Sequence, residues 1–102
     1  MERQERITSR ATLAEHLKAI GMECFVNYYH HFADSNLSST DIIEQMHSRE
    51  GYTEKSCRSR LSKARKVIRD GLSIEALTLI ADSGRLQDSV RNDALQLISA
   101  LE

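Results

Sequence analysis

Seven of the fourteen lysines and arginines in this sequence fall within residues 55–69, and three serines stand among them. Lysine and arginine bind phosphate oxygens, arginine also bonds the acceptor edge of guanine, and serine hydroxyls bond phosphate or base. The residue types and their spacing therefore predict a surface that binds nucleic acid. Its candidate residues are Lys55, Arg58, Ser59, Arg60, Ser62, Lys63, Arg65, Lys66 and Arg69.

The rest of the chain carries the opposite charge. Only Glu54 and Asp70 oppose the seven cations within residues 54–70, so this segment carries +5 while the other 85 residues carry −6. Such an asymmetry, which the formal net charge of −1 hides, indicates a polyanionic partner. The alternative interpretation is a solvated helix whose cations pair with the acidic remainder. Against that alternative, the segment has almost no carboxylates of its own at i, i+4 spacing to relieve the repulsion.

The element that carries these residues belongs to an all-α protein. The 102 residues include no proline and only four glycines, whereas sheet proteins need turns rich in both. A chain of this length has room for a single helical domain. Cys24 and Cys57 are too few for a disulfide framework, and neither a membrane span nor a signal peptide is expected. We therefore expect a cytoplasmic protein with reduced thiols.

Apolar residues at helical spacing predict a compact bundle of five helices, over residues 11–33, 40–48, 54–70, 73–82 and 87–101. Residues 1–8 are expected to form a disordered tail. Ser38 and Thr53 are expected to cap the second and third helices, and Gly71 to follow the third. Gly21 marks a point at which the first helix is open to a kink or a split.

The third predicted helix has a narrow apolar seam formed by Cys57, Leu61, Ala64 and Ile68, at positions i, i+4, i+7 and i+11. These four residues cover an arc of roughly 60° on a wheel of 100° per residue. The seven basic residues occupy nearly all of the remaining circumference. We therefore expect this helix to pack by its seam and to offer the other side chains to solvent or to a ligand.

The aromatic residues and histidines could also bind ligands or metals, but their pattern in the sequence is typical of structural residues. Four of the five aromatic residues, Phe25, Tyr28, Tyr29 and Phe32, cluster in the first helix and are interpreted as core rather than as base-stacking residues. His30 and Asp34 have the i, i+4 spacing of metal ligands but lack a second pair. The sequence contains no phosphate-binding loop, nucleophile elbow or HExxH motif. We therefore predict a protein that is not an enzyme and has no metal, cofactor or small-molecule substrate.

Residues 40–70 together have the outline of a helix-turn-helix, with a short helix, a turn containing Gly51 and a longer basic helix. Within this unit, residues 41–69 resemble the C-terminal (region four) helix-turn-helix of bacterial sigma factors. The likeness lies in Ser56-Cys57-Arg58-Ser59-Arg60-Leu61, in Lys63-Ala64-Arg65 and in the preceding helix from Asp41 to Met46. The turn is expected to be longer than the family's by residues 48–50. Because the chain is too short for a whole sigma factor, the resemblance implies a stand-alone DNA-binding domain with a regulatory role.

The sequence thus favours a small protein that binds double-stranded DNA through the basic helix 54–70. Lys55, Arg58, Ser59 and Ser62 are expected to face the groove, with Lys63, Lys66 and Arg69 on phosphates. The alternative is a protein–protein interaction module. In that case the basic helix docks on an acidic protein, or the chain forms a homodimer through helix 11–33 or helix 87–101. The sequence leaves open whether the basic helix binds DNA, RNA or an acidic protein.

Overall fold

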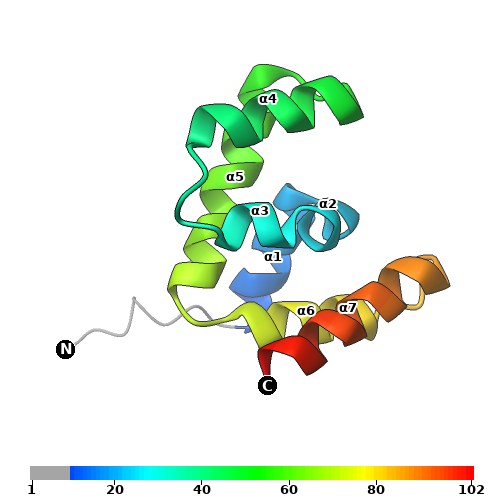
Figure 1. Cartoon of the computed structure of the whole chain (residues 1–102). Coiled ribbons are helices and arrows are strands. Elements are labelled where there is room, and N and C mark those ends of the chain that lie inside the picture. The colour runs from blue at the N-terminus through cyan, green and yellow to red at the C-terminus, as the bar shows by residue number, and fades with distance from the viewer. Residues whose placement is uncertain (1–9) are drawn as a thin grey trace.

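The computed structural model describes residues 10–102, with side chains from residue 12 onward, and within this range the chain forms α-helices and no strand (Figure 1). This confirms the all-α prediction. The predicted tail, residues 1–8, lies outside the described residues. No helix in the described range combines the length and the apolar character that crossing a membrane requires. The helices are α1 (Arg10–Ile20), α2 (Met22–Asn27), α3 (Tyr29–Ala33), α4 (Ser39–Glu50), α5 (Glu54–Arg69), α6 (Ser73–Ala81) and α7 (Asp88–Leu101).

The prediction of one continuous helix over residues 11–33 is wrong, because this segment forms α1, α2 and α3. The first break is at Gly21, whose φ of 92° lies in the left-handed region that glycine tolerates best. The second break is at Tyr28, where φ is −113° and ψ is 16°. Gly21 was identified as a potential break from the sequence, whereas nothing in the local sequence signals the break at Tyr28. The described chain therefore has seven helices rather than five.

The helices on either side of Gly51 are close to the predicted ones, with one correction. Residues 48–50, expected in the turn, continue α4 to Glu50. Gly51 then adopts φ 77° and ends the helix, as left-handed glycines commonly do. The link between α4 and α5 is therefore the short segment Gly51–Thr53.

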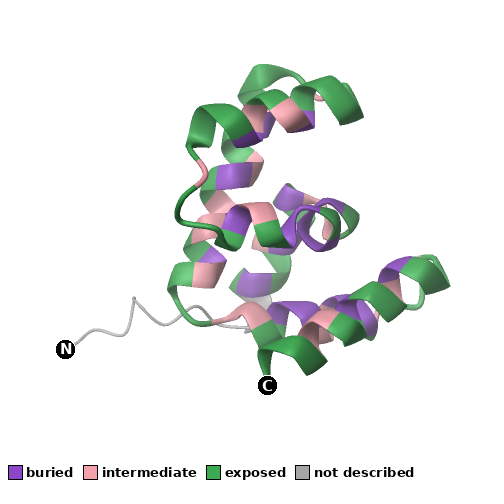
Figure 2. Ribbon diagram, viewed as in Figure 1, coloured by how far each residue is buried: buried purple, intermediate pink, exposed green. Residues whose placement is uncertain are grey.

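The core forms where the helices face one another, as the buried residues in Figure 2 show. Phe25, Tyr28, Tyr29 and Phe32 are all buried, which confirms their interpretation as core residues. The rings of Phe25 and Tyr29 meet edge to face, with their centroids 5.6 Å apart. Both cysteines are buried and free, in agreement with their prediction as reduced thiols.

The arrangement of the helices separates α4 from the C-terminal pair (Figure 1). Helix α4 lies at one end of the molecule, and α6 and α7 pack on each other at the other end. Helix α5 runs between these ends and packs against α1 and α4. This arrangement leaves one side of α5 uncovered along most of its length.

Candidate nucleic-acid-binding surface

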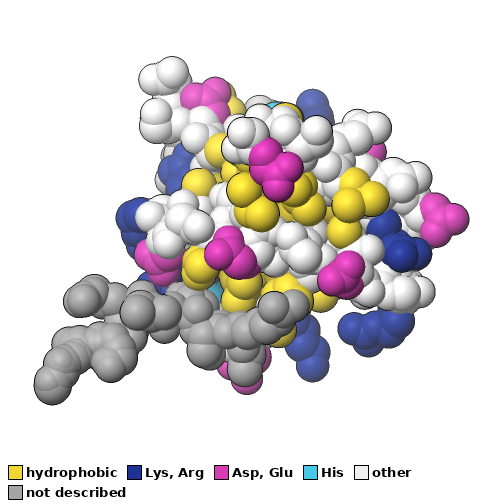
Figure 3. All heavy atoms as spheres, turned by 90° about the horizontal axis from the view of Figure 1, so that it is seen from below, with side chains coloured by type: hydrophobic (Ala, Val, Ile, Leu, Met, Phe, Trp, Pro, Cys, Tyr) yellow, Lys and Arg dark blue, Asp and Glu magenta, His cyan; other side chains and the backbone are white. Residues whose placement is uncertain are grey.

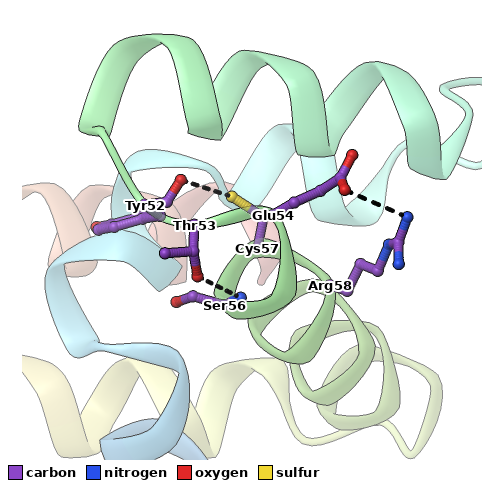
Figure 4. A network of polar contacts seen from close by, with 6 residues as sticks. All are labelled: Tyr52, Thr53, Glu54, Ser56, Cys57 and Arg58. Atoms are coloured by element: carbon purple, nitrogen blue, oxygen red, sulfur yellow. Dashed lines mark hydrogen bonds and ion pairs between the residues drawn. The ribbon is translucent and has the colours of Figure 1, made fainter.

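The turn between α4 and α5 is held by caps and by contacts to its own backbone (Figure 4). The hydroxyl of Thr53 accepts a hydrogen bond from the backbone N–H of Ser56 at 3.1 Å, which confirms Thr53 as the N-cap of α5. The carbonyl oxygen of Tyr52 lies 2.6 Å from Nδ1 of His47 and 4.0 Å from the thiol of Cys57. Both neighbouring helices therefore contact the same short turn and set the position of α5 relative to α4.

The start of α4 is fixed in the same way. The hydroxyl of Ser38 accepts a hydrogen bond from the backbone N–H of Asp41 at 3.1 Å, as the sequence predicted. A Ser, Thr, Asp or Asn at this position contributes about 1 kcal/mol to helix stability. Two capped helices thus meet at a three-residue turn that contains a left-handed glycine.

Arg60 was predicted to lie on the ligand-binding surface, but its guanidinium group points into the protein. Its Nη1 donates a hydrogen bond to the carbonyl oxygen of Ile20, the last residue of α1, and its Nε donates to the hydroxyl of Ser56 at 2.9 Å. The guanidinium carbon also lies 3.8 Å from the centroid of the Tyr52 ring, a cation–π contact. A Cβ atom at Gly21 would lie only 2.8 Å from Nη1 and would displace the guanidinium group, and the φ of 92° also favours glycine at the break after α1.

Arg65 likewise binds the protein itself. Its guanidinium group donates to the carbonyl oxygen of Leu37 at 3.1 Å and contacts that of Phe32 at 3.4 Å. It also lies 3.3 Å from the hydroxyl of Ser39. Arg65 therefore ties α5 to the link between α3 and α4. The expectation that all side chains outside the apolar seam face solvent or a ligand is wrong for Arg60 and Arg65.

The apolar seam of α5 also differs in one position from the prediction. Cys57, Leu61 and Ala64 are buried as expected, but the fourth buried residue is Val67 rather than Ile68, which is half-buried. Val67 lies on the side of the helix that Arg60 also occupies. The buried side of α5 is therefore wider than the predicted seam, because α1 packs along it.

Seven of the nine predicted residues remain together on the outer side of α5. At 100° per residue they span an arc of about 140°. Lys63 is half-buried, with its ammonium group 3.3 Å from the hydroxyl of Ser59, and the other six are exposed. The seven are Lys55, Arg58, Ser59, Ser62, Lys63, Lys66 and Arg69. We call this set the basic face of α5.

The carboxylates near the basic face neutralise it only weakly. Arg58 pairs with Glu54 at 3.7 Å (Figure 4), and Lys66 pairs with Asp70 at 3.6 Å. The side chains of Arg58 and Glu54 are 68% and 69% exposed, and exposed pairs of this kind contribute about 0–1 kcal/mol. An anionic ligand can therefore replace Glu54 beside Arg58 at little cost.

A hollow of about 880 Å³ between α4 and α5 adjoins the basic face. Arg58, Ser62 and Arg69 line it from α5, together with Arg65. The opposite wall is part of α4. Ile43 and Leu61 supply apolar lining, and the remaining lining residues are Ser39, Thr40, Glu44, His47 and Glu54. The hollow extends the basic face toward the first turn of α4, where Ser39 and Thr40 line it.

Much of the opposing negative charge lies at the far end of the molecule. Residues 71–102, which include α6 and α7, hold five acidic and two basic residues. These helices lie at the end opposite α4 (Figure 1). The carboxylates of α6 and α7 are therefore separated from α4 and from the first turns of α5, whereas α4 itself carries Asp41, Glu44 and Glu50.

Burial raises the pKa of both thiols and of two tyrosines next to this region, Tyr28 and Tyr52. Burial raises the pKa of the Cys24 and Cys57 thiols, so both remain protonated at neutral pH. Burial, with the neighbouring Glu50 carboxylate, raises the pKa of Tyr28 to about 12. Its hydroxyl donates a hydrogen bond to Glu50 at 2.9 Å. None of these groups is prepared to act as a nucleophile or base near neutral pH.

Comparisons with protein-family models, curated proteins and solved structures found no match for this chain. The assignment of a function therefore depends on the geometry and charge of the surface described above.

Proposed function

We propose that this chain is a small helix-turn-helix protein that binds double-stranded DNA, with α5 as the recognition helix. The observation that carries the proposal is the basic face of α5. Five cations and two serines share one uncovered side of a helix that follows a three-residue turn. Helix-turn-helix domains place such a helix in the major groove, with its first turns on the base edges.

The position of each side chain along α5 suggests its role. Lys55, Arg58 and Ser59 belong to the first turns and would face the bases, with Ser62 one turn further on. The cations beyond them, Lys63, Lys66 and Arg69, would bind phosphates. Arg60 would not contact DNA, because its guanidinium group already bonds the end of α1. Arg65 lines the hollow, but its guanidinium group already bonds the carbonyl oxygen of Leu37.

Two further observations support the proposal. The acidic α6 and α7 lie at the end of the molecule opposite α4, so they would not approach DNA that α4 and the start of α5 contact. The resemblance of residues 41–69 to the DNA-binding helix-turn-helix of sigma factors points to the same helix. It also points to a regulatory role in transcription.

The salt dependence of binding tests this proposal. If Lys63, Lys66 and Arg69 neutralise about three phosphates, affinity should fall roughly 40-fold between about 50 and 200 mM salt. Fluorescence anisotropy with a labelled random DNA duplex measures this fall, and a duplex RNA competitor separates DNA from RNA. Absence of binding at both salt concentrations would refute the proposal.

A pair of double variants locates the binding surface. Arg58→Gln/Lys63→Gln removes two charges from the basic face, and Lys18→Gln/Arg85→Gln removes two exposed charges from another surface. The first variant should weaken binding strongly and lower the slope against salt by about one phosphate, because Lys63 is placed on a phosphate and Arg58 on the bases. The control should bind almost as the unchanged protein does. Equal losses in the two variants would show that only the total charge matters.

An acidic protein is the second candidate partner, favoured by the composition of the hollow between α4 and α5. Ile43 and Leu61 lie there next to Arg58 and Arg69, a combination that suits an acidic amphipathic helix. This alternative predicts salt-sensitive binding of an acidic helical peptide that duplex DNA does not displace. Displacement by DNA at low concentration would favour the first proposal.

A further inference from the structure

The three large apolar side chains that are exposed within residues 12–102 all belong to the C-terminal helix pair. They are Ile74 in α6 and Leu95 and Leu101 in α7, and Leu95 is the most exposed at 53%. Figure 3, which views the molecule from the side of α6 and α7, shows hydrophobic side chains gathered on this surface with acidic side chains among them.

The outer face of α7 is apolar at its centre and charged at both ends. Arg91, Leu95, Ile98 and Glu102 stand at i, i+4, i+7 and i+11 and share an arc of about 60° on the helix. Ile98 is half-buried and Glu102 exposed. The side chain of Arg91 is 37% exposed and pairs with Asp88 at 3.5 Å. The sequence of this face is therefore charge, apolar, apolar, opposite charge.

This order makes the face complementary to itself in one orientation. In an antiparallel pair of α7 helices with the two-fold axis midway between positions 96 and 97, Leu95 of each copy faces Ile98 of the other. The same axis places Arg91 of each copy opposite Glu102 of the other. A parallel pair would instead place Arg91 against Arg91 and Glu102 against Glu102. Charge therefore selects the antiparallel arrangement.

We propose that two copies of this chain form a symmetric dimer by packing their α7 helices antiparallel across this face. A two-fold interface requires a patch that complements itself, and the order of residues along α7 meets that requirement. The other homodimer surface predicted from sequence, helix 11–33, contributes its apolar residues to the protein's own core. Its buried members include Leu13, Leu17, Phe25 and Phe32.

Sedimentation equilibrium of the full chain in the absence of DNA tests the dimer. An interface formed by one helix of each copy buries little area compared with most protein–protein interfaces. We therefore expect a dissociation constant in the micromolar range. Between about 5 and 500 μM the apparent mass should rise from the 11.6 kDa of one chain toward twice that value. A mass of one chain throughout this range would overturn the proposal. Because no DNA is present, the result is independent of the role proposed for α5.

Matched variants test the face itself. Leu95→Glu places a charge at the centre of the apolar pair and should raise the dissociation constant at least tenfold. It should leave the helical circular dichroism unchanged, because Leu95 is exposed in the single chain. Gln96→Glu adds the same negative charge at an exposed position on another side of α7 and should leave the dimer intact. Equal effects of the two variants, or a dimer that survives Leu95→Glu, would refute the interface.

A charge reversal tests the antiparallel register. Glu102→Arg places an arginine opposite Arg91 of the second copy and should weaken the dimer. Adding Arg91→Glu restores opposite charges and should recover much of the association. This recovery is expected even though Arg91→Glu also removes the hydrogen bond from Arg91 to the carbonyl oxygen of Ala81. If the double variant associates no better than Glu102→Arg alone, the register is wrong.

Discussion

Replacing Arg60 by alanine would remove several contacts that hold α5 against the rest of the protein. The carbonyl oxygen of Ile20 would lose its charged donor, the hydroxyl of Ser56 would lose a partner, and the ring of Tyr52 would lose the guanidinium that lies 3.8 Å from its centroid. A hydrogen bond from a charged group contributes about 1.5–3 kcal/mol, and a partly exposed cation–π contact about 0.5–1 kcal/mol.

Because Arg60 is only half-buried, we expect a loss of about 2–3 kcal/mol in the free energy of unfolding. For a domain of this size, such a loss lowers the melting temperature by about 10–20 °C. Arg58→Ala is the matched control, since it removes the same side chain from the same helix. Its ion pair with Glu54 is exposed, and we expect the variant to change stability by about 0.5 kcal/mol or less.

Urea unfolding followed by far-ultraviolet circular dichroism measures both variants. The midpoint should fall markedly for Arg60→Ala and hardly at all for Arg58→Ala, with similar slopes against urea. The order of the two variants should be reversed for DNA affinity, which Arg58→Ala should lower more than Arg60→Ala. Folded Arg60→Ala should bind DNA almost as the unchanged protein does, whereas Arg58→Ala should lose about 1–3 kcal/mol of binding free energy. Equal stabilities of the two variants would refute the structural role of Arg60.

Two further predictions concern the break after α1 and the contact between α3 and α4. Gly21→Ala should destabilise the protein by at least about 1–2 kcal/mol, because alanine resists a φ of 92° and its Cβ would crowd Arg60. Gly84→Ala, where the added Cβ meets nothing within 4 Å, should be nearly neutral, and urea unfolding of the two variants gives the comparison. The pKa of Tyr28 is raised from 10.0 to about 12, so its contribution to stability is complete below pH 10 and is lost as the pH rises toward 12. Between pH 10 and 12 the free energy of unfolding should therefore fall less steeply with pH in Tyr28→Phe than in the unchanged protein. If the free energy of unfolding has the same pH dependence in both proteins, this reasoning is wrong.

The helix pair α4–α5 could be predicted closely because its signals are local. Ser38 and Thr53 cap helices three residues ahead through their own hydroxyls, and Gly51 and Gly71 follow the helix ends in the left-handed conformation. Residues 48–50 were wrongly expected in the turn, because a polar, exposed helix end and a polar turn have the same composition. Only the conformation of Gly51 shows where α4 ends.

The division of the first predicted helix could be anticipated only at Gly21. The apolar residues before and after Tyr28 continue at helical spacing, so the sequence pattern is that of one helix. In the folded protein, a bend there turns α3 so that its carbonyl end at Phe32 reaches Arg65 on α5. Tertiary packing thus interrupts the helix at Tyr28, although the spacing of the apolar residues on both sides favours one continuous helix.

The sequence by itself determined that the chain is helical, that its positive charge is concentrated on one helix, and where that helix begins and ends. These properties depend on residue types and on spacing within a few positions, where helix periodicity and capping act. Only the tertiary structure decided which of the seven cations are available to a ligand. Arg60 and Arg65 bond to backbone oxygens 40 and 28 residues away, at Ile20 and Leu37. Contacts over such distances arise only when the helices pack, so no local pattern distinguishes these two arginines from their exposed neighbours.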